Sequence, residues 1–451
     1  MQSWADGPDA VMYEIRPRNV YIHERVLRTS EWGRMPQACS RRMERMMACI
    51  HPDETPEVVD DARLNAISRE RRWERVKTWR TGQYKRERDP DIIFNAYRWA
   101  GPEEMAAVNE HFPHLAFARL NGHGMVGYRD GRSLLEKRHG VCQNAYDLHS
   151  AWGCLHACDY CNIGEFLNIV LNLEEMVERL DGLLDANPWL QLYKYDNQTD
   201  TITFEPEYGA SELLVPYFAQ RENEYLMLYT KSANVEHLLD LEHRGHTIVC
   251  WSISCETVSR EIEKNCPTTA ERIEAARQCQ EAGYAVRARF SPIVPIKNWR
   301  AENAAMIEQF LSAVEPDVVT MDVLGLLGYH RLVECLDVSL LDDRYVEMAR
   351  ELYSGEPPER PYWPVGKQMF PHEARAEVYR FFIERMRQVD ADVPISLCDE
   401  TPEMWEELAG ELAGTPAEYV CACGPTSVPG NPLLRSGPGR RTRRRGRPLR
   451  P

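Results

Sequence analysis

Apolar and β-branched runs alternate with amphipathic stretches through the middle of the chain. The stretch 171–184 has apolar residues at helical spacing, and the stretch 268–283 opens with Thr268 and Glu271 as a capping box and closes at Gly283. Strands that alternate with helices of this kind are typical of βαβ units and a parallel sheet. The runs that predict strands are 147–153, 190–195, 225–231, 247–254, 284–294 and 317–325. We therefore expect an α/β fold in which residues 141–400 form a complete or partial barrel of six βα units.

The regions on either side of this alternating pattern differ in composition. Residues 1–140 are rich in Arg, Glu and Trp and predict a mainly helical N-terminal region. Residues 401–423 predict a helical C-terminal extension. Residues 424–451 are dominated by Pro, Gly and Arg, a composition typical of a disordered tail.

One basic stretch in the N-terminal region interleaves charge with aromatic residues. Residues 63–88 carry ten Lys and Arg against three Glu, together with Trp73, Trp79 and Tyr84. Such a stretch can bind a nucleic-acid backbone and stack on bases. It is also typical of a solvated helix whose few apolar side chains face the core, and this second interpretation is the one we favour.

Charge and cysteine usage limit the class of protein. The chain of 451 residues has a formal net charge of −16, so its body is not typical of a protein that wraps nucleic acid, although the eight arginines of residues 435–451 could tether it to a polyanion. No run of 18 apolar residues predicts a membrane span, and the first residues do not resemble a secretory signal. We expect a cytoplasmic protein whose 14 cysteines are free thiols, metal ligands or catalytic groups rather than disulfides.

Three of these cysteines form the motif GCLHACDYCNIGEF, with Cys154, Cys158 and Cys161 at C-x3-C-x2-C spacing. The motif follows the first predicted strand and so falls at the carboxyl end of the sheet, where barrels place their chemistry. A structural zinc site needs four ligands and no matching second pair follows, while His156 lies too close in sequence to be a good fourth ligand. On a [4Fe–4S] cluster, three thiolates would leave one iron open. A third interpretation places the three thiols on one buried helix face, which Gly153 and the preceding strand disfavour.

The motif, with Tyr160 before its last cysteine, resembles that of the radical S-adenosylmethionine superfamily. Further segments resemble the spore photoproduct lyase family in order and spacing: FEPEYGASELLVPYF, LYTKSANVEHLLDL, IVCWSIS, ERIEAARQCQEAGYAVRARFSPIVPIKNW and SLCDETPEMW. The resemblance implies a partial (β/α)6 barrel, a [4Fe–4S] cluster on Cys154, Cys158 and Cys161, and S-adenosylmethionine bound at the open iron. It also implies an electron donor such as flavodoxin or ferredoxin, and reductive cleavage of the cofactor to a 5′-deoxyadenosyl radical.

The resemblance also implies roles for residues around the cofactor. Lys231 and Ser252 match the family positions that hold the methionine and ribose parts of S-adenosylmethionine, and Tyr160 is a further cofactor contact. The chemistry agrees, because an ammonium group can pair with the cofactor carboxylate and a hydroxyl can reach a ribose oxygen. Where the family has a glycine- and acid-rich segment for the cofactor amino group, this chain has KYDNQTD, in which Asp196 and Asn197 are the candidates.

The chain departs from the family at the hydrogen donor. DNA-repair members return a hydrogen atom to the product from a cysteine some 40–50 residues after the cluster motif, and the corresponding stretch, TDTITFEPEYGASE, has none. Cys250, Cys255 and Tyr160 are the candidate catalytic replacements, although buried inert thiols would look the same in sequence. Cys398, Cys421 and Cys423 are a weaker candidate for a second metal site.

We therefore expect a lyase-like radical enzyme that abstracts hydrogen from a substrate not identified by the sequence. One alternative is a DNA repair lyase that splits thymine photolesions with another hydrogen donor. The other is a non-enzymatic iron–sulfur or nucleic-acid-binding protein. Fold does not choose between them, because one barrel supports many functions.

Overall fold

The computed structural model describes residues 13–27, 35–74, 88–161, 163, 166–353 and 369–435. Its larger sheet has eight strands in the order β15-β14-β13-β11-β10-β9-β5-β4, and all pairs except β4–β5 are parallel. Five of the six predicted strands are present as neighbours, and the run predicted at 147–153 divides between β5 and β6 (Ala151–Trp152), the second of which belongs to another sheet. The parallel α/β fold is confirmed. The strands of this sheet are β4 (Val126–Arg129), β5 (Ala145–Leu148), β9 (Leu192–Tyr195), β10 (Tyr225–Thr230), β11 (Thr247–Ser252), β13 (Ala285–Ile293), β14 (Val319–Val323) and β15 (Ile395–Leu397).

Strand pairing does not close this sheet into a barrel, but the segments beside its two edges meet. The Val141 N–H, just before β5, donates to the carbonyl of Glu400, just after β15, at 2.7 Å. The sheet is therefore curved enough to bring β5 and β15 toward one another, although they lie near opposite ends of the strand order.

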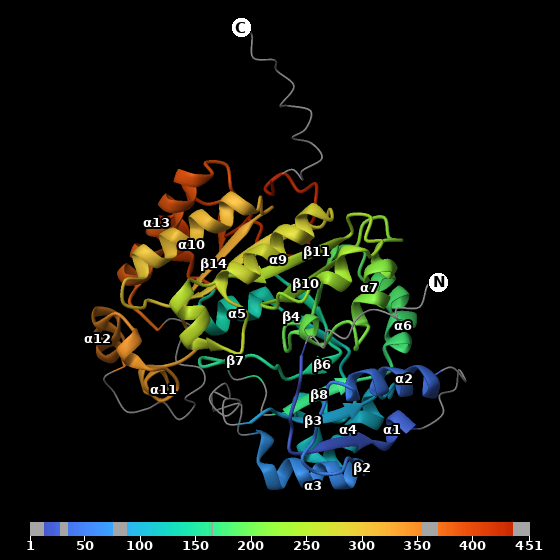
Figure 1. Ribbon diagram of the computed structural model, residues 1–451. Coiled ribbons are helices and arrows are strands. Elements are labelled where there is room, and N and C mark those ends of the chain that lie inside the picture. The colour runs from blue at the N-terminus through green and yellow to red at the C-terminus, as the bar shows by residue number, and fades with distance from the viewer. Residues whose placement is uncertain are drawn as a thin grey trace.

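Helices cover one face of this sheet, as Figure 1 shows for α9, α10 and α13. Side chains alternate along each strand. Phe290 of β13 packs toward Phe310 and Phe382 on the helices, whereas its neighbours Arg287 and Arg289 lie on the opposite, inner face. The helices that follow or precede these strands are α5 (Gly131–Arg138), α6 (Leu173–Ala186), α7 (Ala210–Phe218), α8 (Glu236–Leu239), α9 (Thr269–Glu281), α10 (Trp299–Ala313), α11 (Tyr329–Cys335), α12 (Asp343–Leu352), α13 (His372–Val389) and α14 (Pro402–Glu407).

The capping box predicted for α9 is present. Thr268 accepts a hydrogen bond from the Glu271 N–H, and the Glu271 carboxylate accepts one from the Thr268 N–H at 2.7 Å. Ile273, Ala276 and Cys279 are buried on the face of α9 that meets the sheet. No described helix is long and apolar enough to cross a membrane.

A second sheet, which the sequence did not predict, contains strands of the N-terminal region. Its order is β2-β1-β3-β8-β6, and it lies below the larger sheet in Figure 1. The first three strands come from the N-terminal region and the last two flank the cysteine motif. Its elements are β1 (Val20–His23), β2 (Glu57–Val59), β3 (Asp91–Asn95), β6 (Ala151–Trp152) and β8 (Phe166–Val170), with helices α1 (Glu24–Leu27), α2 (Met35–Met47), α3 (Asp61–Arg71) and α4 (Pro102–His111).

The basic stretch 63–88 lies only partly within the described residues. Its first part is α3, and Trp73 is buried, with its ring stacked on Phe166 at a centroid distance of 4.2 Å. Trp73 is therefore a core residue and is not available to stack on a base. Trp79 and Tyr84 lie outside the described residues.

The C-terminal region differs from the expectation in two ways. Only Pro402–Glu407 is helical within the extension predicted for 401–423, and the following residues form turns. The predicted disorder from residue 424 is wrong for 424–435. Arg287 donates to the carbonyl of Ser427 at 2.7 Å, and Leu434 is buried against Val318 and Val420. Contacts with distant strands order this Pro- and Gly-rich segment, and its composition alone could not show them. Residues 436–451 lie outside the described residues.

Candidate active site

The cysteine motif forms an extended loop that begins after β6 and leads to β8. Gly153 opens it with a φ of 104°, and a Cβ there would lie 2.1 Å from the Phe166 carbonyl oxygen. Within the loop, β7 (Ala157–Cys158) pairs with β12 (Glu263–Lys264), which follows β11 along the chain. The described residues of the motif form no helix, so the interpretation that places three thiols on one helix face is wrong.

Hydrogen bonds clamp this loop against the segment after β11. The Asp159 N–H donates to the Ile262 carbonyl at 2.9 Å, and the Asn265 side chain donates to the Leu155 carbonyl at 2.8 Å. His156 lies between the cysteines with Nδ1 2.8 Å from the Asn265 carbonyl and Nε2 3.0 Å from Asp200. Both ring nitrogens therefore face protein acceptors, and His156 orients the loop rather than offering a ligand.

The surroundings of Cys158 favour the thiolate form, which is the form that binds metals. The Ile163 N–H donates to Cys161 Sγ at 3.4 Å. A hydrogen bond from Cys266 and the charge of Lys231 outweigh burial and lower the pKa of Cys158 to about 6. Among the described residues, no three His, Cys, Asp or Glu side chains are placed to hold a single metal ion. A structural zinc ion needs four ligands, whereas a cubane attaches each of three thiolates to a different iron and leaves the fourth iron open. An all-sulfur donor set with an N–H···S bond fits such a cluster.

A buried carboxylate, Glu263, connects the cysteine loop to the ends of the strands. It is fully buried and accepts hydrogen bonds from Arg272 at 2.6 Å, from Ser254 at 3.0 Å and from the Tyr160 hydroxyl. Lys231 Nζ lies 3.7 Å from the same carboxylate. Burial opposes its ionisation, but Arg272 and Lys231 outweigh this and lower the pKa of Glu263 to about 2. Glu263 therefore stays anionic and holds Tyr160 and Lys231 in place.

Two of the predicted cofactor residues lie side by side. Lys231 directly follows β10 and Ser252 ends β11, and these strands are paired through Thr230 and Trp251. The Ser252 side chain is buried, and its carbonyl accepts a hydrogen bond from Arg272 at 3.2 Å. Lys231 and Ser252 therefore lie together at the carboxyl ends of two neighbouring strands, next to the cysteine loop.

Asp196 and Asn197 lie at the end of β9 with different surroundings. Asp196 is fully buried and its carboxylate is 2.6 Å from His149 Nδ1, with further hydrogen bonds at 3.0 Å from the N–H groups of Ser150 and Gln198. Asn197 is exposed. The Asp196 carboxylate thus joins the ends of β5 and β9, and its role toward a cofactor stays a prediction, as does that of Asn197.

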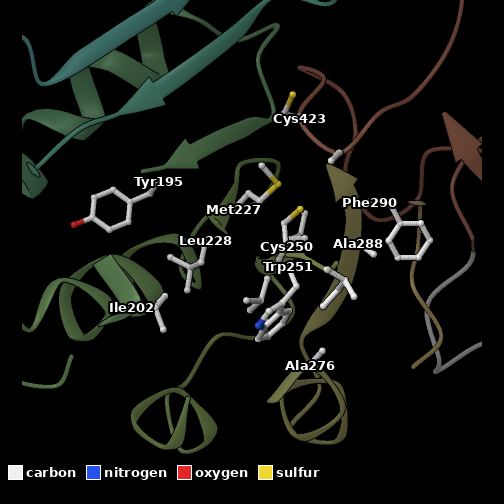
Figure 2. Close-up of a cluster of buried hydrophobic side chains, with 14 of the residues drawn as sticks. Tyr195, Ile202, Met227, Leu228, Cys250, Trp251, Ala276, Ala288, Phe290 and Cys423 are labelled. Carbon is white, nitrogen blue, oxygen red and sulfur yellow. The ribbon is translucent and has the colours of Figure 1, made fainter. Parts of the chain in front are cut away.

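The candidate hydrogen donors Cys250 and Cys255 are both buried. Burial raises the pKa of the Cys250 thiol, and burial also raises the pKa of Cys255 to about 12. Each sulfur is therefore protonated at neutral pH, which a hydrogen-atom donor requires and an inert core thiol also shows. Figure 2 shows Cys250 within the hydrophobic core beside Trp251. Cys423 lies nearby and belongs to residues 408–435, the C-terminal segment.

Two residues of this site were missed by sequence reasoning. Asp200 accepts hydrogen bonds from the Thr230 hydroxyl at 2.8 Å and the Lys231 N–H at 2.7 Å, and it contacts His156 of the cysteine loop. Cys266 lies with its sulfur 3.7 Å from that of Cys158. Only their positions could have indicated them, because Asp200 follows β9 and Cys266 follows β12, the strand that pairs with the cysteine loop.

A parallel α/β sheet with a three-cysteine loop at its carboxyl edge is the arrangement of a radical S-adenosylmethionine protein. More specifically, this chain belongs to the spore photoproduct lyase family, whose model matches residues 132–392. It is 26% identical over 196 residues to spore photoproduct lyase of Bacillus subtilis (strain 168), covering 42% of this chain and 57% of the relative. It is 23% identical over 171 residues to that of Clostridium acetobutylicum, covering 36% and 51%. The chain thus spans about half the length of the curated relatives it matches.

Solved structures share the fold over a longer stretch. A spore photoproduct lyase complexed with dinucleoside spore photoproduct matches with a TM-score of 0.52 and 14% identity, over 84% of this chain and 98% of that one. A double mutant with bound AdoMet and dinucleoside spore photoproduct matches with a TM-score of 0.50 and 14% identity, over 85% and 98%. At this identity the likeness shows the fold.

Proposed function

We propose that this protein is a radical S-adenosylmethionine lyase in which Cys154, Cys158 and Cys161 hold a [4Fe–4S] cluster. One observation carries the proposal. The cysteine loop is clamped by β12 and Asp200 directly against the strand ends that present Lys231 and Ser252. Sulfur donors for a cluster and polar groups for the cofactor are therefore brought to one edge of the sheet.

The chain's own groups prepare this edge for the cofactor. The bound cluster would supply the electron that cleaves S-adenosylmethionine reductively. Lys231 offers its ammonium group to the cofactor carboxylate, and the Ser252 hydroxyl is placed for a ribose oxygen. Glu263 keeps Lys231 charged and oriented, and the Tyr160 hydroxyl donates to the same carboxylate. Burial of these groups excludes water from the site.

The substrate we propose is a thymine photolesion of the spore photoproduct type. The support is family membership together with the shared fold of a relative solved with dinucleoside spore photoproduct. Because residues 199–212 contain no cysteine, the hydrogen returned to the product must come from another group. Cys250, Cys255 and Tyr160 are the candidates. Cys250 lies in β11, two residues before Ser252.

Formation of 5′-deoxyadenosine tests the cofactor chemistry. The full chain is reconstituted anaerobically with iron and sulfide, then reduced with dithionite in the presence of S-adenosylmethionine, and the products are separated by chromatography. We expect 5′-deoxyadenosine from the native chain and from Cys279→Ala, a buried cysteine on α9, and none from Cys158→Ala. A native chain that binds iron and yields none would favour the non-enzymatic alternative.

A second assay tests the substrate. Dinucleoside spore photoproduct is added to the same mixture, and thymidine products are quantified by mass spectrometry in deuterated and ordinary water. We expect repaired product that carries deuterium if an exchangeable S–H or O–H supplies the returned hydrogen. Formation of 5′-deoxyadenosine without repair would exclude this substrate while leaving the cofactor chemistry intact.

A further inference from the structure

Four cysteines that the proposed active site does not use converge where the two edges of the larger sheet meet. Cys142 precedes β5, Cys398 follows β15, and Cys421 and Cys423 belong to the C-terminal segment. The Val141–Glu400 hydrogen bond at 2.7 Å brings Cys142 and Cys398 together. Gln143 donates to the Tyr419 carbonyl at 2.7 Å and so holds the C-terminal segment beside them. Residues more than 250 positions apart in sequence thus place their thiols in one region.

Two arginines of the inner face point their donors at these sulfurs. Arg129 Nη2 lies 3.0 Å from Cys423 Sγ, and Arg289 Nη2 lies 3.2 Å from Cys398 Sγ. Cys421 Sγ lies 3.8 Å from Gln143 Oε1. Guanidinium donors directed at sulfur stabilise thiolates, the form that binds metals.

Tyr419 and Arg129 each place beside these cysteines a buried polar atom that has no partner in the described ranges. The Tyr419 side chain is 7% exposed, and within the described part of the chain its hydroxyl has no hydrogen-bond partner. Tyr419 lies two residues before Cys421, and its carbonyl accepts the hydrogen bond from Gln143 at 2.7 Å. The Nε of Arg129 is also buried without a partner among the described residues. Arg129 contacts Cys423 and Tyr419 contacts Gln143, so both of these buried atoms belong to residues beside the cysteines.

We propose that Cys142, Cys398, Cys421 and Cys423 hold a second [4Fe–4S] cluster. Four thiolates match its four irons and leave no open position, so this cluster binds no S-adenosylmethionine. A zinc ion at this position, which would draw its four sulfurs to about 3.8 Å from one another, is the outcome that the metal counts below exclude. Arg129 and Arg289 offset the negative charge of the thiolates, and the cluster pins the C-terminal segment between the sheet edges.

Iron and sulfide counts on the full chain test this proposal. After anaerobic reconstitution we expect about eight irons and eight sulfides per native chain, at four per cluster. The variant with Cys154, Cys158 and Cys161 all changed to Ala should keep about four of each, with a reduced-state electron paramagnetic resonance signal that S-adenosylmethionine does not alter. A variant with no iron–sulfur signal, or one that binds zinc at this position, overturns the proposal.

A complementary variant keeps the test decisive if the first one does not fold. Cys421→Ala with Cys423→Ala should lose about half of the iron while its remaining signal still responds to S-adenosylmethionine, and Cys279→Ala should match the native chain. Iron content equal to that of the native chain in the double variant would contradict the second cluster. Neither result depends on turnover. The second cluster can therefore be disproved while the lyase activity holds, and the lyase activity can be disproved while the second cluster holds.

Discussion

At the scale of single residues, Glu263 is the side chain on which the candidate site depends most. It is an anion with no solvent exposure that contacts Arg272, Ser254, Tyr160 and Lys231. A buried ion pair is costly to break, because removing one partner leaves the other charge buried without compensation. The sequence could not show this, since Glu263 looks like any glutamate of a charged stretch until β12 places it against Cys158.

Glu263→Gln should therefore destabilise the protein strongly. We expect a loss of about 3–5 kcal/mol at pH 7, because Arg272 stays buried opposite a neutral amide. Urea denaturation followed by circular dichroism measures it. The matched control is Glu274→Gln on the exposed surface of α9, where the pair with Arg277 is solvated and the unfolding midpoint should not move measurably.

The contribution of Glu263 should also depend on pH in a defined direction. Its pKa is lowered from 4.5 to about 2 in the folded protein, so the folded state is stabilised above pH 4.5, and this stabilisation is lost as pH falls toward 2. The stability difference between native protein and Glu263→Gln should be constant from neutral pH to about 5 and shrink below. A difference that grows on acidification would contradict the assignment.

Lys231 should act on the cofactor without acting on the cluster. Its ammonium group lies at the strand end with a side chain 16% exposed, and a charge-assisted hydrogen bond is worth about 1.5–3 kcal/mol. Lys231→Met should weaken S-adenosylmethionine binding roughly 10- to 100-fold with unchanged iron content. Isothermal titration measures the affinity, and Lys297→Met, at an exposed lysine, is the control. Equal affinity in the two variants would remove Lys231 from the site.

At the scale of elements, the sequence predicted the strands and the helix cap that local patterns encode. It did not predict the structures that form by pairing of distant segments. The six parallel strands and the capping box of α9 follow from periodicity and from Thr268 and Glu271. The second sheet does not, because β1 and β3 are short and pair only through contacts between distant segments. The same holds for the cysteine loop, whose clamp by β12 joins residues about a hundred positions apart in sequence.

Gly153→Ala should disturb that loop specifically. A Cβ would meet the Phe166 carbonyl at 2.1 Å and the φ of 104° is strained for alanine, so we expect a loss of at least about 1–2 kcal/mol and reduced iron retention. Gly182→Ala in α6 is the opposite case, with nothing within 4 Å and a helical position where alanine stabilises by about 0.5–1 kcal/mol. Thermal unfolding and iron content distinguish them. Similar behaviour of the two variants would exclude a special role for Gly153.

At the scale of the whole molecule, the curved sheet creates two separate groups of cysteines. Cys154, Cys158 and Cys161 lie at the carboxyl edge of the strands, and the other group lies where β5, β15 and the C-terminal segment meet. Composition indicated disorder from residue 424, yet Arg287 of β13 donates to the carbonyl of Ser427 at 2.7 Å, as it does to the carbonyl of Ala422 at 2.8 Å. Only the assembled fold brings those partners together, so this part of the molecule could not be derived from sequence pattern.

The most direct test is whether S-adenosylmethionine binds the open iron of the cluster held by Cys154, Cys158 and Cys161. The Cys421→Ala, Cys423→Ala variant is reconstituted, reduced and frozen with S-adenosylmethionine labelled with ¹⁵N at its amino group, and electron–nuclear double resonance is recorded. The account predicts a ¹⁵N hyperfine coupling that disappears when the cofactor is omitted. A reduced cluster that shows no such coupling at saturating cofactor would contradict it.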